Sequence, residues 1–503
     1  MVQMNPRRLF FWLLAPLLVF RLWLAGALPI TADEAYFIWW GKIPDWGFYD
    51  HPPMVGWWLA AQLLLGDGAA WLRLSSVLQP LVLAGAVAWF VPRIWSGTED
   101  WRRWSAALLV LLAPTSVWNV LITTDTPLAY GSVLSGLAWL RARRDGHLGW
   151  YLASGLFLAL AVLSKYFVAF LGFAYLVDVL RRPDRRGLTG LAIVYGCCLP
   201  ALGLMAWWNM EHCWPNYMFN FVNRHGKAAL SWKTPLLYGL TLIYLLTPPL
   251  LWQLLRRPTA WCRPELTSLA VLAWVPLALF GLLSLKKTVG LHWMLSFLPF
   301  ALLLAALGLE ARLLARLRIF FLGFAALHIV LLAGASLTSL ESWQRAKWYE
   351  SAVLAFEAET IAARLKPYAA DYVFASDGYA DAVTLGYNAR RYFLVFGEAS
   401  SHARHDDILT DFRVLDGKNI LILQKDAPVA EEYAPYFREL RTETFSLHGV
   451  TFHQIMGRGF DYARYRDRVL ATARDKYYQI PSWLPQGACY FCDRYWPGKT
   501  CPH

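Results

Sequence analysis

Charged residues are scarce in this sequence. They make up 16% of the 503 residues, whereas hydrophobic residues make up 57%, and the mean hydropathy is +0.36. A soluble chain of this length needs far more polar surface, so the composition excludes an ordinary soluble protein and predicts that much of the chain faces lipid. The 27 Trp, 24 Tyr and 28 Phe are typical of aromatic belts at two membrane interfaces.

The sequence also lacks a concentrated basic patch. Its net charge of +12 is spread over short Arg and Lys clusters between apolar runs, which argues against nucleic acid as a partner. The positive-inside rule predicts that these clusters face the cytoplasm. No cleavable signal is apparent, and the first apolar run, which carries Arg21, is expected to remain as a helix. The clusters lie at residues 7–8, 93–103, 141–144, 181–186, 256–263 and 312–318.

Apolar runs predict a mainly α, polytopic bundle of about eleven transmembrane helices. With the N-terminus in the cytoplasm, an odd number of crossings places everything after residue 340 in the periplasm. The predicted domains are therefore residues 1–339, the membrane domain with its outer-face loops, and residues 340–503, a periplasmic α/β domain. The runs lie near residues 9–30, 71–92, 104–121, 126–140, 148–163, 166–180, 188–208, 235–254, 266–285, 293–309 and 319–338.

Two further segments have a predicted structure. Residues 53–65 are apolar but short, which favours a re-entrant or interfacial helix over a crossing. In the C-terminal domain, short β-type runs at 372–375, 392–396 and 420–423 alternate with expected helices at 346–366 and 428–439. This alternation predicts a small α/β domain.

An acidic loop, residues 31–54, follows the first run. It holds Asp33, Glu34, Asp45, Asp50 and His51 at the expected outer face, where ionisable groups are costly and usually functional. A carboxylate there could take the proton of an acceptor hydroxyl. Two structural alternatives are open: Asp33 could cap a helix that starts at Ala35, and Asp50-His51 could form a polar turn.

Further charged candidates lie in the other predicted outer turns. Asp125 could serve chemistry or cap a helix, and Lys165 could pair with a lipid phosphate or extend its amine to the interface. Arg224 suits bidentate phosphate or carboxylate binding, although surface solvation explains it nearly as well. The candidate phosphate-binding residues are His51, Arg73, Lys165, Arg224, Lys286, Lys287 and His292.

These motifs resemble a known family. The Asp-Glu pair, the Trp-Gly-Phe-Tyr-Asp-His-Pro-Pro stretch at 46–53, Asp125, Lys165 and the Trp-Asn stretch at 208–224 are similar to bacterial members of glycosyltransferase family 39. These are relatives of the protein O-mannosyltransferases and of the lipid A aminoarabinose transferase. The resemblance covers about residues 9–310 and implies the GT-C fold and inverting transfer of a sugar from a polyprenyl phosphate at the outer leaflet.

The resemblance also implies roles for individual residues. Asp33 matches the family's catalytic aspartate and Glu34 its neighbour, and Asp125 is expected to share the catalytic site. Asp50 and His51 match a Glu-Lys pair of the aminoarabinose transferases, in which the Glu helps to bind a metal and the Lys faces the donor phosphate. This sequence has His instead of Lys, so His51 could bind phosphate, bind a metal or be protonated by its acidic surroundings. A divalent metal ion at Asp50 is therefore a candidate cofactor and not a certain one.

The cysteines and the reaction leave alternatives open. Cys489, Cys492 and Cys501, with His503, could form a disulfide or a metal site, while Cys197, Cys198, Cys213 and Cys262 are expected to be packing residues. A transporter or lipid flippase is the alternative function. Against it, no twofold repeat is visible, and the charged residues gather on one face and not at the midplane. No Gly-rich phosphate loop lies on the cytoplasmic side, which favours a lipid-linked donor over a nucleotide sugar. The acceptor could be a lipid, a glycan or a protein.

Overall fold

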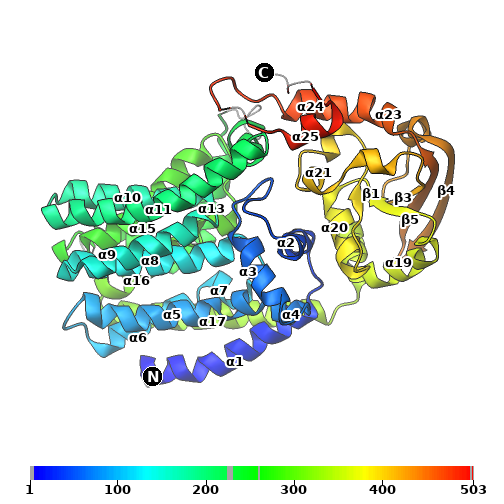
Figure 1. Cartoon of the computed structure of the whole chain (residues 1–503). Coiled ribbons are helices and arrows are strands. Elements are labelled where there is room, and N and C mark those ends of the chain that lie inside the picture. The colour runs from blue at the N-terminus through cyan, green and yellow to red at the C-terminus, as the bar shows by residue number, and fades with distance from the viewer. Residues whose placement is uncertain (1–4, 224–229, 259–260, 486, 499–500, 502–503) are drawn as a thin grey trace. The chain divides into compact units, whose positions relative to one another are not determined.

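The computed structural model describes residues 5–223, 230–258, 261–485, 487–498 and 501, and its elements are labelled in Figure 1. The chain divides into two compact units. The helical unit comprises residues 1–28, 65–203 and 227–336, and the mixed unit comprises residues 29–64, 204–226 and 337–503. The units therefore do not follow chain order, and the predicted boundary near residue 339 stays a prediction.

The helical unit contains the long apolar helices, which run roughly side by side in Figure 1. Among the described residues, five helices are long and apolar enough to cross a membrane, or six if a pair bent by 100° at Thr247 counts as one span. A multi-pass membrane protein is therefore confirmed, whereas the number eleven is not. The helices are α1 (Pro6–Ala27), α4 (Ala69–Leu72), α5 (Leu74–Ile94), α6 (Asp100–Leu111), α7 (Pro114–Trp118), α8 (Asp125–Asp145), α9 (Leu148–Val162), α10 (Ala169–Arg181), α11 (Arg185–Glu211), α13 (Lys233–Leu246), α14 (Pro248–Arg256), α15 (Thr267–Ser284), α16 (Leu298–Gly308) and α17 (Ala311–Ser336), and α11 continues into the mixed unit.

Arg21 shows how the helical unit accommodates a cation inside its first helix. The side chain is buried, and its guanidinium donates to the backbone carbonyls of Val77 (2.9 Å) and Asn119 (2.8 Å), as well as to those of Ser76 and Ser116. Asn119 directly follows α7, where a helix leaves carbonyl groups without an intrahelical partner. Arg21 therefore satisfies backbone acceptors at a helix end.

The mixed unit is built on a five-stranded sheet with the order β2-β1-β3-β5-β4. The strands β2, β1 and β3 are parallel, and β5 is antiparallel to both β3 and β4. The strands are β1 (Val373–Ser376), β2 (Leu394–Val395), β3 (Ile420–Gln424), β4 (Phe437–Leu447) and β5 (Val450–Phe460). The helices of this unit are α2 (Ala32–Lys42), α3 (Met54–Leu63), α12 (Pro215–Tyr217), α18 (Tyr349–Phe356), α19 (Ala358–Leu365), α20 (Tyr379–Asn388), α21 (Asp406–Leu409), α22 (Ala430–Tyr433), α23 (Tyr462–Tyr465), α24 (Ala471–Tyr477) and α25 (Tyr490–Tyr495).

Both faces of this sheet are covered. All five residues of β3 are buried, and successive side chains alternate between two hydrophobic clusters, because strand side chains point to opposite faces in turn. Leu421 and Leu423 pack with side chains from α18, α19 and α20, whereas Ile420 and Ile422 pack with side chains from α23, α24 and α25. The predicted α/β domain is therefore confirmed as a mixed sheet between helical layers.

One prediction in this domain is wrong. Residues 428–439 were expected to be helical, but α22 ends at Tyr433 and the long strand β4 begins at Phe437. A two-residue turn, His448-Gly449, joins β4 to β5, and both turn residues have positive φ, as a tight hairpin requires. The strand escapes a sequence pattern search because its exposed face carries several charged residues instead of a clean alternation.

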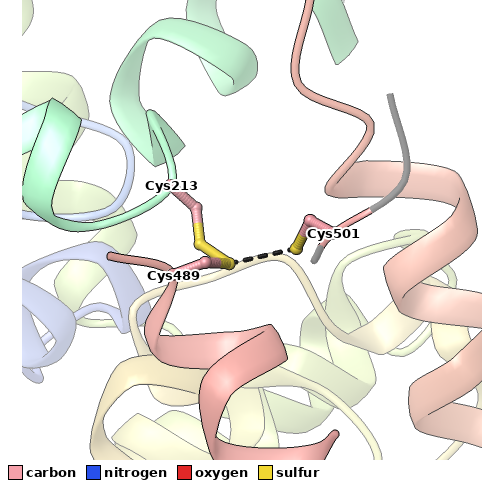
Figure 2. A group of neighbouring side chains, drawn as sticks. All are labelled: Cys213, Cys489 and Cys501. Atoms are coloured by element: carbon pink, nitrogen blue, oxygen red, sulfur yellow. Dashed lines mark hydrogen bonds between the residues drawn. A yellow bond between two sulfur atoms is a disulfide. The ribbon is translucent and has the colours of Figure 1, made fainter. Parts of the chain in front are cut away.

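Four of the seven cysteines form disulfides, which corrects the expectation for Cys213. Cys213 is bonded to Cys489, and Cys492 is bonded to Cys501. Cys213 follows α11 in a turn with a φ of 63°, and its partner lies 276 residues further on, so proximity to a helix gave no sign of the bond. Figure 2 shows Cys489 and Cys501 pointing toward each other, with their sulfurs 3.1 Å apart. His503 lies outside the described residues.

Candidate functional site

The acidic loop begins with a capping box at the start of α2. Thr31 is the N-cap, its side-chain oxygen accepts the backbone N–H of Glu34, and the Glu34 carboxylate accepts the backbone N–H of Thr31 at 3.0 Å. Glu34 is fully buried. The alternative in which Asp33 caps a helix starting at Ala35 is therefore wrong, since α2 begins at Ala32 and the cap is Thr31.

Asp33 is the exposed member of the acidic pair. It lies in the first turn of α2, where the helix dipole favours a negative charge. The Tyr379 hydroxyl donates to Asp33 Oδ1 at 3.4 Å from the start of α20, within the same unit. Burial is the main cause of a raised pKa for Tyr379, and the negative charge of Asp33 adds to it. The phenol therefore stays protonated and can donate to the carboxylate.

The second half of the acidic loop is held by the Trp-Asn stretch, residues 208–224, which begins in the last turn of α11. Trp208 donates its indole N–H to Asp45 Oδ2 at 3.1 Å. The side-chain amides of Asn216 and Asn220 donate to the backbone carbonyls of Phe48 (3.0 Å) and Asp50 (2.9 Å). Two motifs that the sequence places about 170 residues apart thus form one structure, in which the second fixes the backbone of the first.

The packing around Gly47 explains why the Trp-Gly-Phe-Tyr-Asp-His stretch contains a glycine. A Cβ atom at this position would collide with the indole ring of Trp208. Only glycine lets the loop backbone approach that ring so closely. The side chain of the next residue, Phe48, is buried and stacks on Trp40 of α2 with ring centroids 4.4 Å apart. The loop is therefore packed against its own helix.

Arg404 pairs with Asp50 at the other end of the loop. Its guanidinium lies 3.3 Å from Asp50 Oδ2, and 26% of the Arg404 side chain is exposed against 6% of the Asp50 side chain. The guanidinium also lies over the rings of Tyr379 (4.4 Å) and Phe219 (5.1 Å). Burial would lower the pKa of Arg404, but the negative charge of Asp50, with further groups, raises it above its ordinary value.

The residues that follow Arg404 hold two buried titratable groups. His405 Nδ1 accepts the backbone N–H of Tyr49 at 3.4 Å, and burial lowers the pKa of His405 to about 3, so this ring is neutral. Burial and the neighbouring Asp407 raise the pKa of Asp406 to about 7. His51, by contrast, is half-buried and lies against the rings of Phe37 and Trp40, with both pairs of centroids 6.2 Å apart.

The helical unit brings three of the predicted residues together. Lys165 Nζ lies 2.8 Å from Asp125 Oδ2, and His292 Nε2 lies 3.8 Å from the same oxygen. The Asp125 and Lys165 side chains are 3% and 7% exposed, whereas that of His292 is 50% exposed. Asp125 is the first residue of α8, but its side chain forms no capping bond, and the N-cap is Thr124. Lys165 therefore pairs internally and does not extend to the interface.

The remaining predicted cations differ in their surroundings. Arg73 is buried and donates to the carbonyls of Ala25 and Leu28, both at 2.8 Å, so it has a structural role at the end of α1. Lys286 is exposed, and Lys287 lies 6.0 Å from the ring of Trp293. Arg224 lies outside the described residues. Phosphate contacts by any of these residues stay a prediction.

The surroundings of Asp50 do not fit a divalent metal ion. A metal of this kind needs several oxygen or nitrogen ligands. In the part of the chain that the structure describes, the three side chains that converge as closely as metal ligands do are Cys213, Cys489 and Cys501, which all form disulfides, and no such group includes Asp50. The Asp50 carboxylate instead faces the fixed positive charge of Arg404, which would repel a bound cation. No step of the chemistry is therefore assigned to a metal here.

Comparisons with known proteins show what this chain is similar to. Residues 50–208, which include the end of the acidic loop and the Asp125–Lys165 pair, match the model of the dolichyl-phosphate-mannose-protein mannosyltransferases. The match covers less than a third of the chain. The lipid A galacturonosyltransferase RgtD of Rhizobium johnstonii is 30% identical over 228 residues. That alignment covers 42% of this chain and 45% of RgtD, so the chain spans less than half of that relative.

Solved structures confirm the fold that the family resemblance implied. ArnT from Cupriavidus metallidurans bound to undecaprenyl phosphate superposes with a TM-score of 0.65, at 17% identity, over 89% of this chain and 97% of that chain. The same protein in its apo state gives a TM-score of 0.61 over the same shares. These likenesses establish a shared GT-C fold. The predicted fold class is therefore correct in its membrane bundle and in its C-terminal sheet domain.

The sequence interpretation missed the residues of the C-terminal domain that complete the acidic loop. Tyr379 and Arg404 lie 346 and 354 residues from their partners Asp33 and Asp50. One signal was available: Ser-His-Ala-Arg-His-Asp-Asp at 401–407 is the densest run of polar ionisable residues in that domain. Its spacing fits no known catalytic motif, so nothing connected it with the loop.

Proposed function

We propose that this protein is an inverting glycosyltransferase that moves a sugar from a polyprenyl-phosphate donor to a lipid, glycan or protein acceptor. The observation that carries the proposal is Asp33. Its carboxylate is exposed while the residues around it are fixed: Glu34 by the capping box, and Asp50 by Asn220 and Arg404. An accessible acid on a rigid frame is what a general base requires.

In the proposed reaction, Asp33 takes the proton from an acceptor hydroxyl. The acceptor oxygen then attacks the anomeric carbon from the face opposite the phosphate, and the bond between that carbon and the phosphate oxygen breaks. The configuration inverts, and the polyprenyl phosphate leaves as an anion. Tyr379 donates to Asp33 and so orients the carboxylate for the proton transfer.

Cations stabilise the charge that develops on a departing phosphate. Within the helical unit, the segment 286–292 is the candidate for this role, because Lys286 is exposed and half of the His292 side chain is accessible. Lys165 is already paired with Asp125. We therefore propose that this pair stabilises the start of α8 and the segment that contains His292. His51, Lys287, Arg73 and Arg224 remain secondary candidates for phosphate binding.

The relatives support a narrower proposal for the acceptor and the donor. RgtD is named as a lipid A transferase, and ArnT has been seen with undecaprenyl phosphate, so we propose a lipid A type acceptor and a donor on that carrier. We further propose a protein of the inner membrane with about eleven crossings. Its N-terminus would be cytoplasmic, and residues 340–503 would form the periplasmic domain.

The test compares Asp33→Asn with Asp475→Asn, a matched control on an exposed carboxylate that pairs with the neighbouring Arg474. Transfer of radiolabelled sugar from a polyprenyl-phosphate donor to lipid A is measured with purified protein in detergent. We expect Asp33→Asn to lower kcat about 1000-fold, because a positioned base contributes about 100- to 10,000-fold. Full activity of Asp33→Asn would disprove the mechanism, and a transporter would retain substrate movement in that variant.

A further inference from the structure

The acidic loop receives its fixed positive charge from the C-terminal domain. Arg404 lies 3.3 Å from Asp50, and this pair joins two segments of the mixed unit that are 354 residues apart in sequence. The guanidinium stands between the rings of Tyr379 and Phe219, which restrict its orientation. Tyr379 also donates to Asp33, so one phenol ring contacts both the Arg404 cation and the proposed base.

The backbone before Arg404 is held in an unfavourable conformation. Ala403 has a φ of 68°, in the left-handed region that a residue with a side chain rarely adopts. Such conformations persist where the surrounding structure enforces them, and they are concentrated at functional sites. Here the strained residue is the one that aims Arg404 at the acidic loop.

A buried network enforces this conformation. The Asp407 carboxylate accepts the backbone N–H of Ala403 at 2.7 Å, and its other oxygen bonds to His402 Nδ1 at 2.7 Å. His402 Nε2 bonds in turn to the Tyr465 hydroxyl at 2.9 Å, and Tyr478 donates to Asp407 at 3.1 Å. A polar network this well satisfied fixes one geometry. The network therefore holds the loop 402–407 in the conformation in which Arg404 meets Asp50.

We propose that Arg404 is a positioning residue that takes the place of a divalent metal ion at Asp50. Its guanidinium supplies the positive charge that the Asp50 carboxylate faces, and it holds the acidic loop in the conformation in which Asp33 meets the acceptor. In this chain the C-terminal domain thus completes the site of transfer. The kinetic part of this inference rests on the proposed function, and the metal part is independent of it.

The kinetic experiment uses the full-length protein with Arg404→Gln, Arg404→Lys and the control Arg413→Gln, an arginine whose carboxylate partner, Asp411, is local and more exposed than Asp50. We expect Arg404→Gln to lower kcat about 100-fold, the size of effect that misplacement by 1 Å produces, with little change in KM. Arg404→Lys keeps the charge and should recover part of that loss. Arg413→Gln should match the wild type in kcat, and the thermal midpoint of each variant shows whether it is folded at the assay temperature. A kcat within threefold of wild type for Arg404→Gln would overturn the proposal.

The metal experiment measures bound divalent metal by mass spectrometry in purified wild type and in Asp50→Asn after exposure to Mg²⁺, Mn²⁺ or Zn²⁺. We expect equal metal content in both, and wild-type transfer that survives chelation. Stoichiometric metal that is lost in Asp50→Asn would overturn the proposal. If Arg404→Gln fails to fold, the kcat of Arg404→Lys and the metal content of the wild type decide whether the proposal holds. If the wild type transfers no sugar at all, the proposed function fails, while the metal content still tests the site.

Discussion

Asp33 and Asp125 are both predicted site carboxylates, but they differ in exposure and in charge partner. Asp33, in the mixed unit, is exposed and accepts one long hydrogen bond from Tyr379. Asp125, in the helical unit, is 3% exposed and pairs with Lys165 at 2.8 Å. A carboxylate that accepts a substrate proton must be accessible and must not be neutralised by a close cation. The contrast supports the proposal that Asp33 takes the acceptor proton, and it predicts that Asp125 organises the helical unit.

The largest expected effect is on stability, and it tests the structural role of Asp125. Asp125→Asn leaves the Lys165 ammonium buried without its partner, which should destabilise the protein by about 3–5 kcal/mol. The exposed pair Arg257–Glu310 provides the control, and Arg257→Gln should cost less than about 1 kcal/mol. Thermal unfolding in detergent measures both. An Asp125→Asn protein as stable as the wild type, yet inactive, would instead place Asp125 in the chemistry.

The next prediction concerns how the stability of the mixed unit depends on pH through Asp406. The folded pKa of Asp406 is about 7, above its ordinary value of 3.8, so the folded state holds this proton more tightly than the unfolded state. Stability from this group is present below pH 4 and should be lost as pH rises from about 4 to about 7, by on the order of a few kcal/mol.

Asp406→Asn should flatten that decline when thermal midpoints are compared across this range. Asp411→Asn is a control of opposite sign, because Arg413 lowers the pKa of Asp411. The stability that Asp411 contributes is lost as pH falls, so its removal should reduce stability above pH 4 and matter little below it. A decline between pH 4 and 7 that survives in Asp406→Asn would mean that another group carries it.

The smallest expected effect separates the two neighbours of the Asp-Glu pair. Glu34→Ala removes one half of the capping box and should cost about 1 kcal/mol, whereas Glu34→Gln can keep the hydrogen bond to the Thr31 N–H. We expect Glu34→Gln to keep both its stability and most of its transfer activity. Loss of transfer activity at unchanged stability would mean that Glu34 has the catalytic role that the sequence predicted.

The sequence predicted those parts of the fold whose residues carry their own signal. Apolar runs predicted the helices of the membrane bundle, because a helix that faces lipid must be apolar over most of its surface. The buried strands β1 and β3 were found for the same reason, as short apolar runs. The hairpin β4–β5 was missed, because one of its strands exposes charged residues and resembles a polar helix.

The site divides in the same way. Asp33, Asp50, Asp125, Lys165 and His292 were chosen from sequence because ionisable residues are conspicuous among apolar ones. The partners that give them different roles could not be found. Thr31 and Glu34 are local and form a recognisable capping box, but Arg404, Tyr379 and the bond from Cys213 to Cys489 join segments hundreds of residues apart.

Composition and apolar runs by themselves determined that this is a multi-pass membrane protein, and the motifs located an acidic loop after its first helix. Only the tertiary structure decided which acid of that loop is exposed, which is a helix cap, and which faces an arginine from the C-terminal domain. The physical reason is that the exposure and the charge partner of a side chain depend on segments that are distant in sequence and that folding brings together. The local sequence does not show which of these segments will meet.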